Sequence, residues 1–81
     1  MVEIRFLNVS MENNLPTFVR LNAETRLDAI ERFAALHGLT IDEVGEETVW
    51  FTRQGHRVLF SVSGFDPLLA LLLQLPCRLV V

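Results

Sequence analysis

The segment TVWFTRQGHRVLFSVS, residues 48–63, constrains the fold most, because it predicts a β-hairpin together with its register. Gln54-Gly55 suits a tight two-residue turn, in which a glycine accepts the positive φ that such turns require. A loop of these two residues predicts every pair of the hairpin: Arg53–His56, Thr52–Arg57, Phe51–Val58, Trp50–Leu59 and Val49–Phe60.

Successive pairs of a hairpin alternate between the two faces of the sheet. One face is apolar, and we expect it to form the core under a helix: Val49, Phe51, Val58 and Phe60. The opposite face should be wet, yet Trp50 meets Leu59 there, beside Arg57. Trp and Arg are enriched at binding hot spots, so Trp50, Arg57 and Leu59 are candidate partner-binding residues. The alternative is that a last helix buries them within the monomer, and both interpretations stay open.

The first residues predict a strand with one wet face, because three apolar residues alternate with charged ones: Val2, Ile4 and Phe6. Leu7 and Val9 are then apolar at odd-numbered positions, which belong to the opposite face of the strand. This switch indicates a bulge near Phe6–Leu7, or a strand that is covered on both faces towards its end. The segment LPTFVRL, residues 15–21, predicts a second strand that starts next to a proline.

A helix is the clearest element of the chain. Thr25 is a suitable N-cap with Asp28 three residues later, and Gly38 is a suitable left-handed stop. The apolar arc of this helix includes Phe33, which we expect to pack on the sheet. TIDE, residues 40–43, predicts one short turn at most. DEVGEE, residues 42–47, predicts an acidic loop, either as a solvated connection or as an electrostatic site for a basic partner.

The C-terminal segment FDPLLALLLQLPCRLVV, residues 65–81, predicts a second helix. Asp66 and Pro67 suit its start, Pro76 ends it, and a short final strand can follow. Its leucines spread over most of the helical circle, so one sheet cannot bury them all. We therefore expect part of this helix to meet another surface, with three candidate partner-binding residues: Leu68, Leu69 and Leu72.

The predicted fold is a single α+β domain over residues 1–81, because a chain of 81 residues has room for one core. The element order is β-β-α-β-β-α(-β). We expect an antiparallel or mixed sheet of four to five strands. The first helix lies on one face, and the leucine-rich helix lies on the other face or at an interface.

Composition narrows the classes of partner. The hydrophobic fraction is 51%, high for a domain that should be more polar than average because it is small. The excess apolar residues must cover each other or a partner. A net charge of −3 argues against nucleic acid. The run from Pro67 to Leu75 is too short for a membrane span, which needs about 20 residues.

The sequence predicts a cytoplasmic protein without catalytic or cofactor chemistry. The N-terminus lacks the apolar core of a signal peptide, and Cys77 is the only cysteine, so it cannot form an internal disulfide. His37, His56 and Cys77 lack the close spacing of zinc ligands. The four glycines are isolated, so none forms a phosphate-binding loop. We expect no metal, no cofactor and no enzymatic activity.

The first two-thirds of the chain resembles a β-grasp, ubiquitin-like domain. The resemblance covers roughly residues 1–57: two opening strands, a helix from Thr25 to Gly38, a short loop with Asp42 and a strand at VWF. It implies a fold and no function. Conjugating members of the family end in a di-glycine tail, whereas this chain ends in Leu79-Val80-Val81, so conjugation chemistry does not carry over.

These features together predict a small non-enzymatic protein-interaction module. We expect it to act as a homodimer, or as an adaptor or inhibitor of a larger protein, through the Trp50/Leu59 face and the leucine-rich helix. The partner is a protein, and neither nucleic acid nor a membrane. The alternative is a small ligand-binding or enzymatic domain with an apolar pocket between the sheet and the C-terminal helix.

Overall fold

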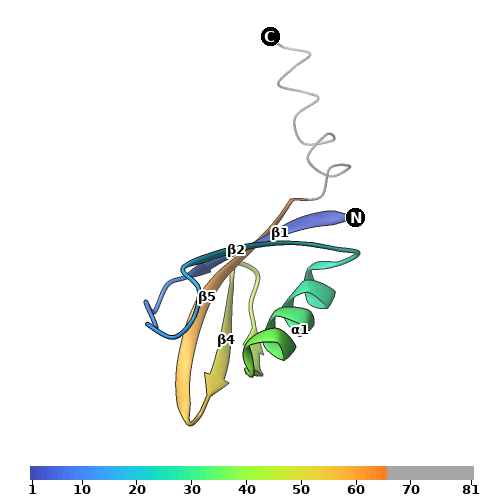
Figure 1. Cartoon of the computed structure of the whole chain (residues 1–81). Coiled ribbons are helices and arrows are strands. Elements are labelled where there is room, and N and C mark those ends of the chain that lie inside the picture. Colours follow the sequence, from blue (N-terminus) through green and yellow to red (C-terminus); the bar gives the residue numbers. More distant parts are fainter. Residues whose placement is uncertain (66–81) are drawn as a thin grey trace, which may run out of the picture.

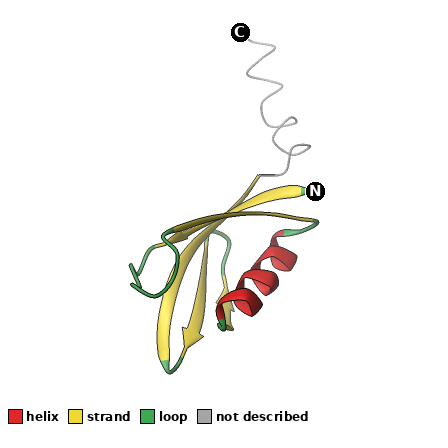
Figure 2. Cartoon of the chain, in the orientation of Figure 1, coloured by secondary structure: helices red, strands yellow, loops and turns green. Residues whose placement is uncertain are grey.

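The computed structural model describes residues 1–65 and shows one sheet and one helix (Figure 1). The elements follow in this order: β1 (Val2–Asn8), β2 (Phe18–Ala23), α1 (Arg26–His37), β3 (Thr40–Val44), β4 (Thr48–Arg53) and β5 (His56–Phe65). The strands lie in the order β2-β1-β5-β4-β3, and each is antiparallel to its neighbours. Helix α1 lies against one face of the sheet, here called the inner face (Figure 2). The opposite face is called the outer face.

The β4–β5 hairpin has the register that the sequence predicts. Arg53 pairs with His56, and the pairing continues through Trp50 with Leu59. Gln54 has φ 52° and Gly55 has φ 80°. Two positive φ values at the central residues are those of a type I′ turn, whose twist matches that of the flanking strands. The two-residue loop is therefore confirmed, and with it the faces of β4 and β5.

Helix α1 begins and ends where its caps predict. The Thr25 hydroxyl accepts a hydrogen bond from the Asp28 backbone N–H at 3.0 Å. At the other end Gly38 adopts the left-handed conformation with φ 67°, and its N–H bonds the Ala34 carbonyl. These contacts satisfy backbone groups that a helix end otherwise leaves unpaired. The predicted cap and stop are both confirmed.

Phe33 is the centre of the core. Its ring stacks on Phe6 at 4.2 Å between centroids and meets Phe60 edge-on at 5.0 Å and Phe51 at 5.8 Å. All four rings are fully buried, and the predicted core residues of the hairpin lie in the same cluster. Helix α1 and the inner face of the sheet thus share one continuous apolar layer.

The predicted layout β-β-α-β-β-α(-β) is wrong. Residues 1–65 form five antiparallel strands and one short helix, so the described structure is mostly sheet. The error lies at residues 40–44, where a turn and an acidic loop were expected and β3 is found. Among the described strands β3 lies at the edge and pairs with β4 alone, and a register shift lies between Ile41 and Glu43. Because β3 pairs on one side and most of its side chains are exposed, its sequence lacks the apolar alternation that marks a strand with one buried face. The predicted C-terminal helix and final strand lie outside the described residues.

Candidate functional site

Five apolar side chains cross the outer face of the sheet from β2 to β4. Phe18 of β2 lies opposite Leu7 of β1, and Val9 follows two residues after Leu7. The Val9 N–H bonds the Leu59 carbonyl of β5 at 3.0 Å, and Leu59 lies opposite Trp50 of β4. We call this set the outer stripe. Phe18, Leu7 and Val9 are 50%, 47% and 46% exposed, so half of each side chain is open to solvent. None of the described elements covers this face.

The outer position of Leu7 and Val9 follows from the straight course of β1. The register of β1 is continuous with both neighbours from Glu3 to Leu7, so the predicted bulge at Phe6–Leu7 is wrong. An irregularity comes later: the N–H groups of Val9 and Ser10 both bond the Leu59 carbonyl, at 3.0 and 3.2 Å. Two donors on one carbonyl are the pattern of a β-bulge. The side chains of β1 therefore alternate between the two faces through Leu7, and the odd-numbered ones face outward.

Arg57 lies over the Trp50 ring, with its guanidinium carbon 4.4 Å from the ring centroid. Its Nε is 3.6 Å from a carboxylate oxygen of Asp42, which also accepts a hydrogen bond from the Thr52 hydroxyl. The cation shields part of the indole face, and Trp50 is accordingly half-buried. A cation held over an aromatic ring gives this end of the outer stripe a fixed shape.

A charged cluster borders the outer stripe on its other side. The Glu3 carboxylate accepts hydrogen bonds from Arg20, with Nε at 2.5 Å, and from Arg5, with Nη2 at 3.0 Å. The Arg20 hydrogen bond, followed by that of Arg5, holds the pKa of Glu3 below its ordinary value. The stripe thus runs between two groups of charges whose positive members are already paired with carboxylates.

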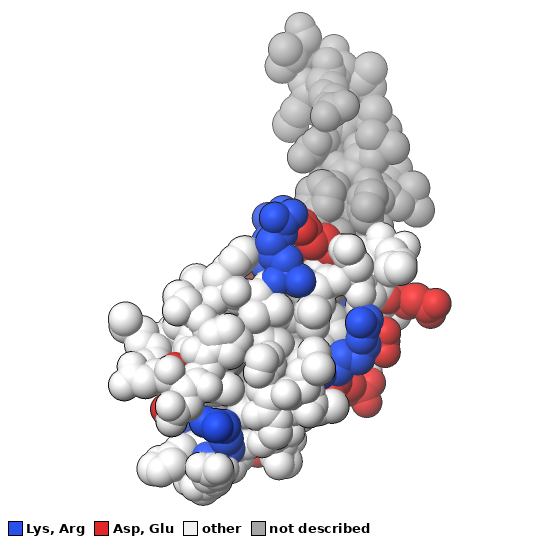
Figure 3. All heavy atoms as spheres, viewed as in Figure 1, with Lys and Arg blue, Asp and Glu red and all other residues white. Residues whose placement is uncertain are grey.

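The arginines do not merge into one basic surface among residues 1–65. Arg5 and Arg20 share Glu3, and Arg57 pairs with Asp42. Arg53 projects elsewhere, into a hollow on the side of the hairpin. On the face drawn in Figure 3, the blue patches stand apart on a largely uncharged surface. The array of free cations that would follow a phosphate backbone is not formed by this part of the chain.

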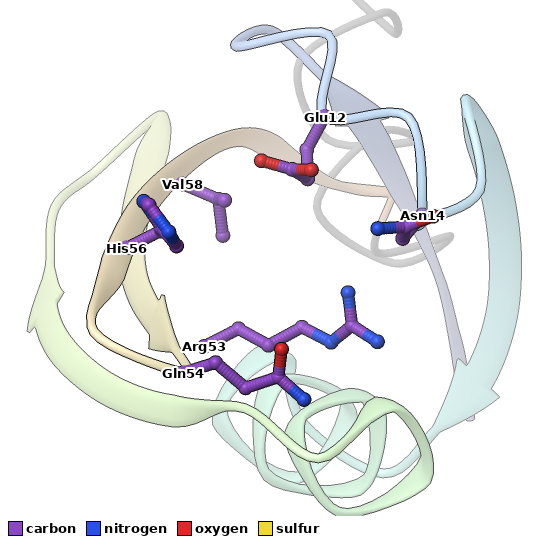
Figure 4. A pocket seen from close by; sticks show the side chains of 6 residues that line it. All are labelled: Glu12, Asn14, Arg53, Gln54, His56 and Val58. Carbon is purple, nitrogen blue, oxygen red and sulfur yellow. The ribbon is translucent and has the colours of Figure 1, made fainter.

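A polar hollow of about 260 Å³ lies between the β1–β2 loop and the β4–β5 hairpin. Figure 4 shows Glu12 and Asn14 reaching into it from the loop, opposite Arg53 from β4. The lining has one acid, one guanidinium and one imidazole, with amides between them. Within residues 1–65 no group of three or more potential metal-ligating side chains comes together. His37 lies apart, against Phe33 at 4.6 Å between ring centroids.

The structure brings together three of the six predicted partner-binding residues. Trp50, Arg57 and Leu59 lie in mutual contact or in direct pairing on the outer face. The other predicted residues lie outside the described part of the chain: Leu68, Leu69 and Leu72. Sequence reasoning did not assign Leu7, Val9 and Phe18 to this surface. The change of parity at Leu7 was the available signal, and it was interpreted as a bulge near Phe6–Leu7 or as a strand covered on both faces towards its end.

No family model matches the chain, and no curated protein and no solved structure matches it. The resemblance to the β-grasp family therefore stays a prediction. No helix within residues 1–65 has the length and apolar character needed to cross a membrane.

Proposed function

We propose that this protein is a small non-enzymatic interaction module whose outer stripe docks a larger protein, as an adaptor or an inhibitor does. The observation that carries the proposal is the half-exposed row of Phe18, Leu7 and Val9, continued by Leu59 and Trp50. An antiparallel sheet with one solvated face normally carries polar residues on that face. Contiguous exposed apolar surface instead marks sites of association.

The chemistry of the surface fits a partner with an apolar ridge. The centre of the stripe is uncharged, and its borders are the Glu3 cluster at one side and the Arg57–Asp42 pair at the other. Charged rims around an apolar centre are the usual anatomy of a protein interface. Because the rim arginines already have carboxylate partners, nucleic acid is a poorer fit. A cytoplasmic location suits a chain with a single cysteine.

The proposal is tested by two matched variants, Leu7→Glu and Leu27→Glu. Leu7 is 47% exposed on the outer face, and Leu27 is 53% exposed on α1 at the opposite face. Each replaces a half-exposed leucine with a carboxylate, so the two changes are matched in exposure and in charge. Proteins captured from native lysate by the folded wild type are identified, purified and titrated against both variants.

We expect one captured protein to bind the wild type and Leu27→Glu alike, and to lose at least about tenfold in affinity for Leu7→Glu. Trp50→Ala should reduce the same affinity. A captured protein that loses equal affinity for the two glutamate variants would contradict docking on the outer stripe. So would the absence of any protein that distinguishes them.

A further inference from the structure

One edge of the sheet, formed by β2, presents backbone groups that no other strand within residues 1–65 pairs with. The Asn8 N–H bonds the Thr17 carbonyl at 2.9 Å. The backbone N–H and C=O groups of Thr17 and of every second residue after it therefore point towards β1. Phe18, Arg20 and Asn22 therefore turn their N–H and C=O groups away from the sheet. Among residues 1–65 only the Asn22 carbonyl finds a partner, Arg32 Nη1 at 2.9 Å. The remaining groups are donors and acceptors in the ladder spacing that another strand needs.

The opposite edge, formed by β3, is protected against such pairing. The register shift between Ile41 and Glu43 breaks the even spacing of its outward groups. Bulges and charged residues are the usual devices that block an edge, and Asp42 and Glu43 supply the charge. β2 lacks the register shift, because its pairing with β1 is regular along its whole length, and its one charged residue, Arg20, is paired with Glu3. The two edges of the sheet are therefore not equivalent, and β2 is the open one.

Apolar side chains flank the β2 edge on both faces of the sheet. Phe18 is 50% exposed on the outer face, while Val19 and Leu21 are only partly buried against the core on the inner face. Leu36 is 69% exposed and lies one helical turn beyond Arg32, the residue that reaches β2 from α1. A strand added along β2 would cover apolar surface on both sides as well as fill the backbone ladder.

We propose that β2 pairs antiparallel with β2 of a second copy of this chain, across a twofold axis at Val19. In this register Phe18 of each copy lies opposite Arg20 of the other, and each such pair exchanges two backbone hydrogen bonds. Val19 meets Val19 of the second copy on the inner face. The Asn22 N–H faces the carbonyl of Pro16 of the second copy. Pro16 has no N–H to donate, and the Asn22 carbonyl it would meet is already bonded to Arg32.

Two other registers that keep the twofold axis, at Arg20 and at Leu21, fit less well. An axis at Arg20 sets two guanidinium-bearing residues directly opposite each other, which is destabilising. It also makes the Phe18 N–H compete with Arg32 for the Asn22 carbonyl. An axis at Leu21 makes the Arg20 N–H of each copy compete with Arg32 for the Asn22 carbonyl of the other copy. The axis at Val19 leaves every outward group of Phe18 and Arg20 with a free partner, and it places Arg20 beside the Phe18 ring.

This pairing would join the two sheets into one and bring the two outer stripes together at Phe18. The inference uses a different surface from the proposed function, since it depends on the edge of β2 rather than on the docking of a larger protein. Strand addition at a sheet edge is a general mode of recognition, and a twofold axis lets the same strand serve as both halves.

The first measurement is the mass in solution, by light scattering and sedimentation over micromolar to millimolar concentrations. We expect a shift with concentration from the 9.2 kDa monomer to twice that mass. The second measurement is amide hydrogen exchange on the wild type by NMR. The Phe18 and Arg20 amides should exchange fast in dilute solution and become protected together as the dimer forms, while Val19 and Leu21, bonded to β1 already, change little.

Arg20→Pro is the decisive variant, because it removes an outward N–H without removing a bond to β1. Arg20→Ala is its control, since it loses the same side chain and the Glu3 contact but keeps the N–H. We expect Arg20→Pro to weaken the dimer by about thirtyfold, one hydrogen bond being lost from each copy, and Arg20→Ala to weaken it much less.

A species that stays at the monomer mass at every concentration overturns the proposal. So does a dimer in which the Phe18 and Arg20 amides remain unprotected, or one that folded Arg20→Pro forms as readily as Arg20→Ala. If Arg20→Pro does not fold, the exchange measurement on the wild type decides. Loss of binding to a larger protein in Leu7→Glu does not enter this test, so the two proposals fail separately.

Discussion

Replacing Phe33 by alanine tests the assignment of the core. The side chain is fully buried, and its ring contacts those of Phe6, Phe51 and Phe60. Truncating a buried phenylalanine costs about 3–5 kcal/mol. The upper half of that range applies here, because three aromatic neighbours lose their partner and each such pair is worth about 0.5–1.5 kcal/mol.

That loss is large against the whole stability of the protein. At about 0.05–0.15 kcal/mol per residue, a chain of 81 residues has a free energy of unfolding of about 4–12 kcal/mol. We expect Phe33→Ala to be mostly unfolded at 25 °C or to have little stability left. Phe33→Leu, which keeps most of the apolar volume, should lose less.

Urea denaturation followed by circular dichroism gives the measurement, with Leu27→Ala as the control. Leu27 lies on the same helix and is 53% exposed, so its truncation should cost well under half as much. With a urea slope of about 1 kcal/mol per molar, the Phe33→Ala midpoint should fall by several molar or vanish. Equal midpoints for Phe33→Ala and the wild type would refute the packing of α1 on the inner face.

Three further changes act on single local interactions. Gly38→Ala should cost about 1–2 kcal/mol in urea unfolding, because φ 67° opposes a Cβ although no atom lies within 4 Å of it; a neutral result would deny the left-handed stop. Gln54→Asn should raise the melting midpoint, because asparagine before Gly55 favours the type I′ turn; a lower midpoint would contradict that turn. The pKa of Glu3 is lowered in the folded state by Arg20, so its contribution is complete above the ordinary glutamate pKa of about 4.3 and is lost as the pH falls through the lowered value. The difference in the free energy of unfolding between wild type and Glu3→Gln should therefore shrink on acidification. A difference that grows would contradict a lowered pKa of Glu3 in the folded state.

The parts of the fold that the sequence predicts are those in which a local interaction determines the geometry. A two-residue turn at Gln54-Gly55 fixes the whole register of β4 and β5, and with it the facing of Trp50 and Leu59. Thr25 and Gly38 mark the ends of α1 because each satisfies backbone groups of its own helix. These features need no knowledge of the neighbouring strands.

Other parts depend on neighbours that are distant in sequence. β3 forms because β4 offers it a partner, and its own residues show no alternation that would reveal this. Leu7 takes its outward position from the regular pairing of β1 with β2 and β5 on either side. Phe18 belongs to the outer stripe only once its pairing with Leu7 is known. The candidate surface was thus predicted at its hairpin end and missed at its other end.

The open surfaces follow from the number of elements. Residues 1–65 form five strands and one helix of 12 residues, and α1 packs on the inner face, so none of the described elements covers the outer one. A face that no element within residues 1–65 covers is expected to be polar, and the Glu3 cluster and the serines of β5 meet that expectation. The outer stripe breaks the polar pattern, and the regular β2 edge lacks the register shift that β3 has. Departures from a consistent pattern concentrate at functional sites. Both departures meet at Phe18, whose side chain ends the stripe and whose backbone belongs to the open edge.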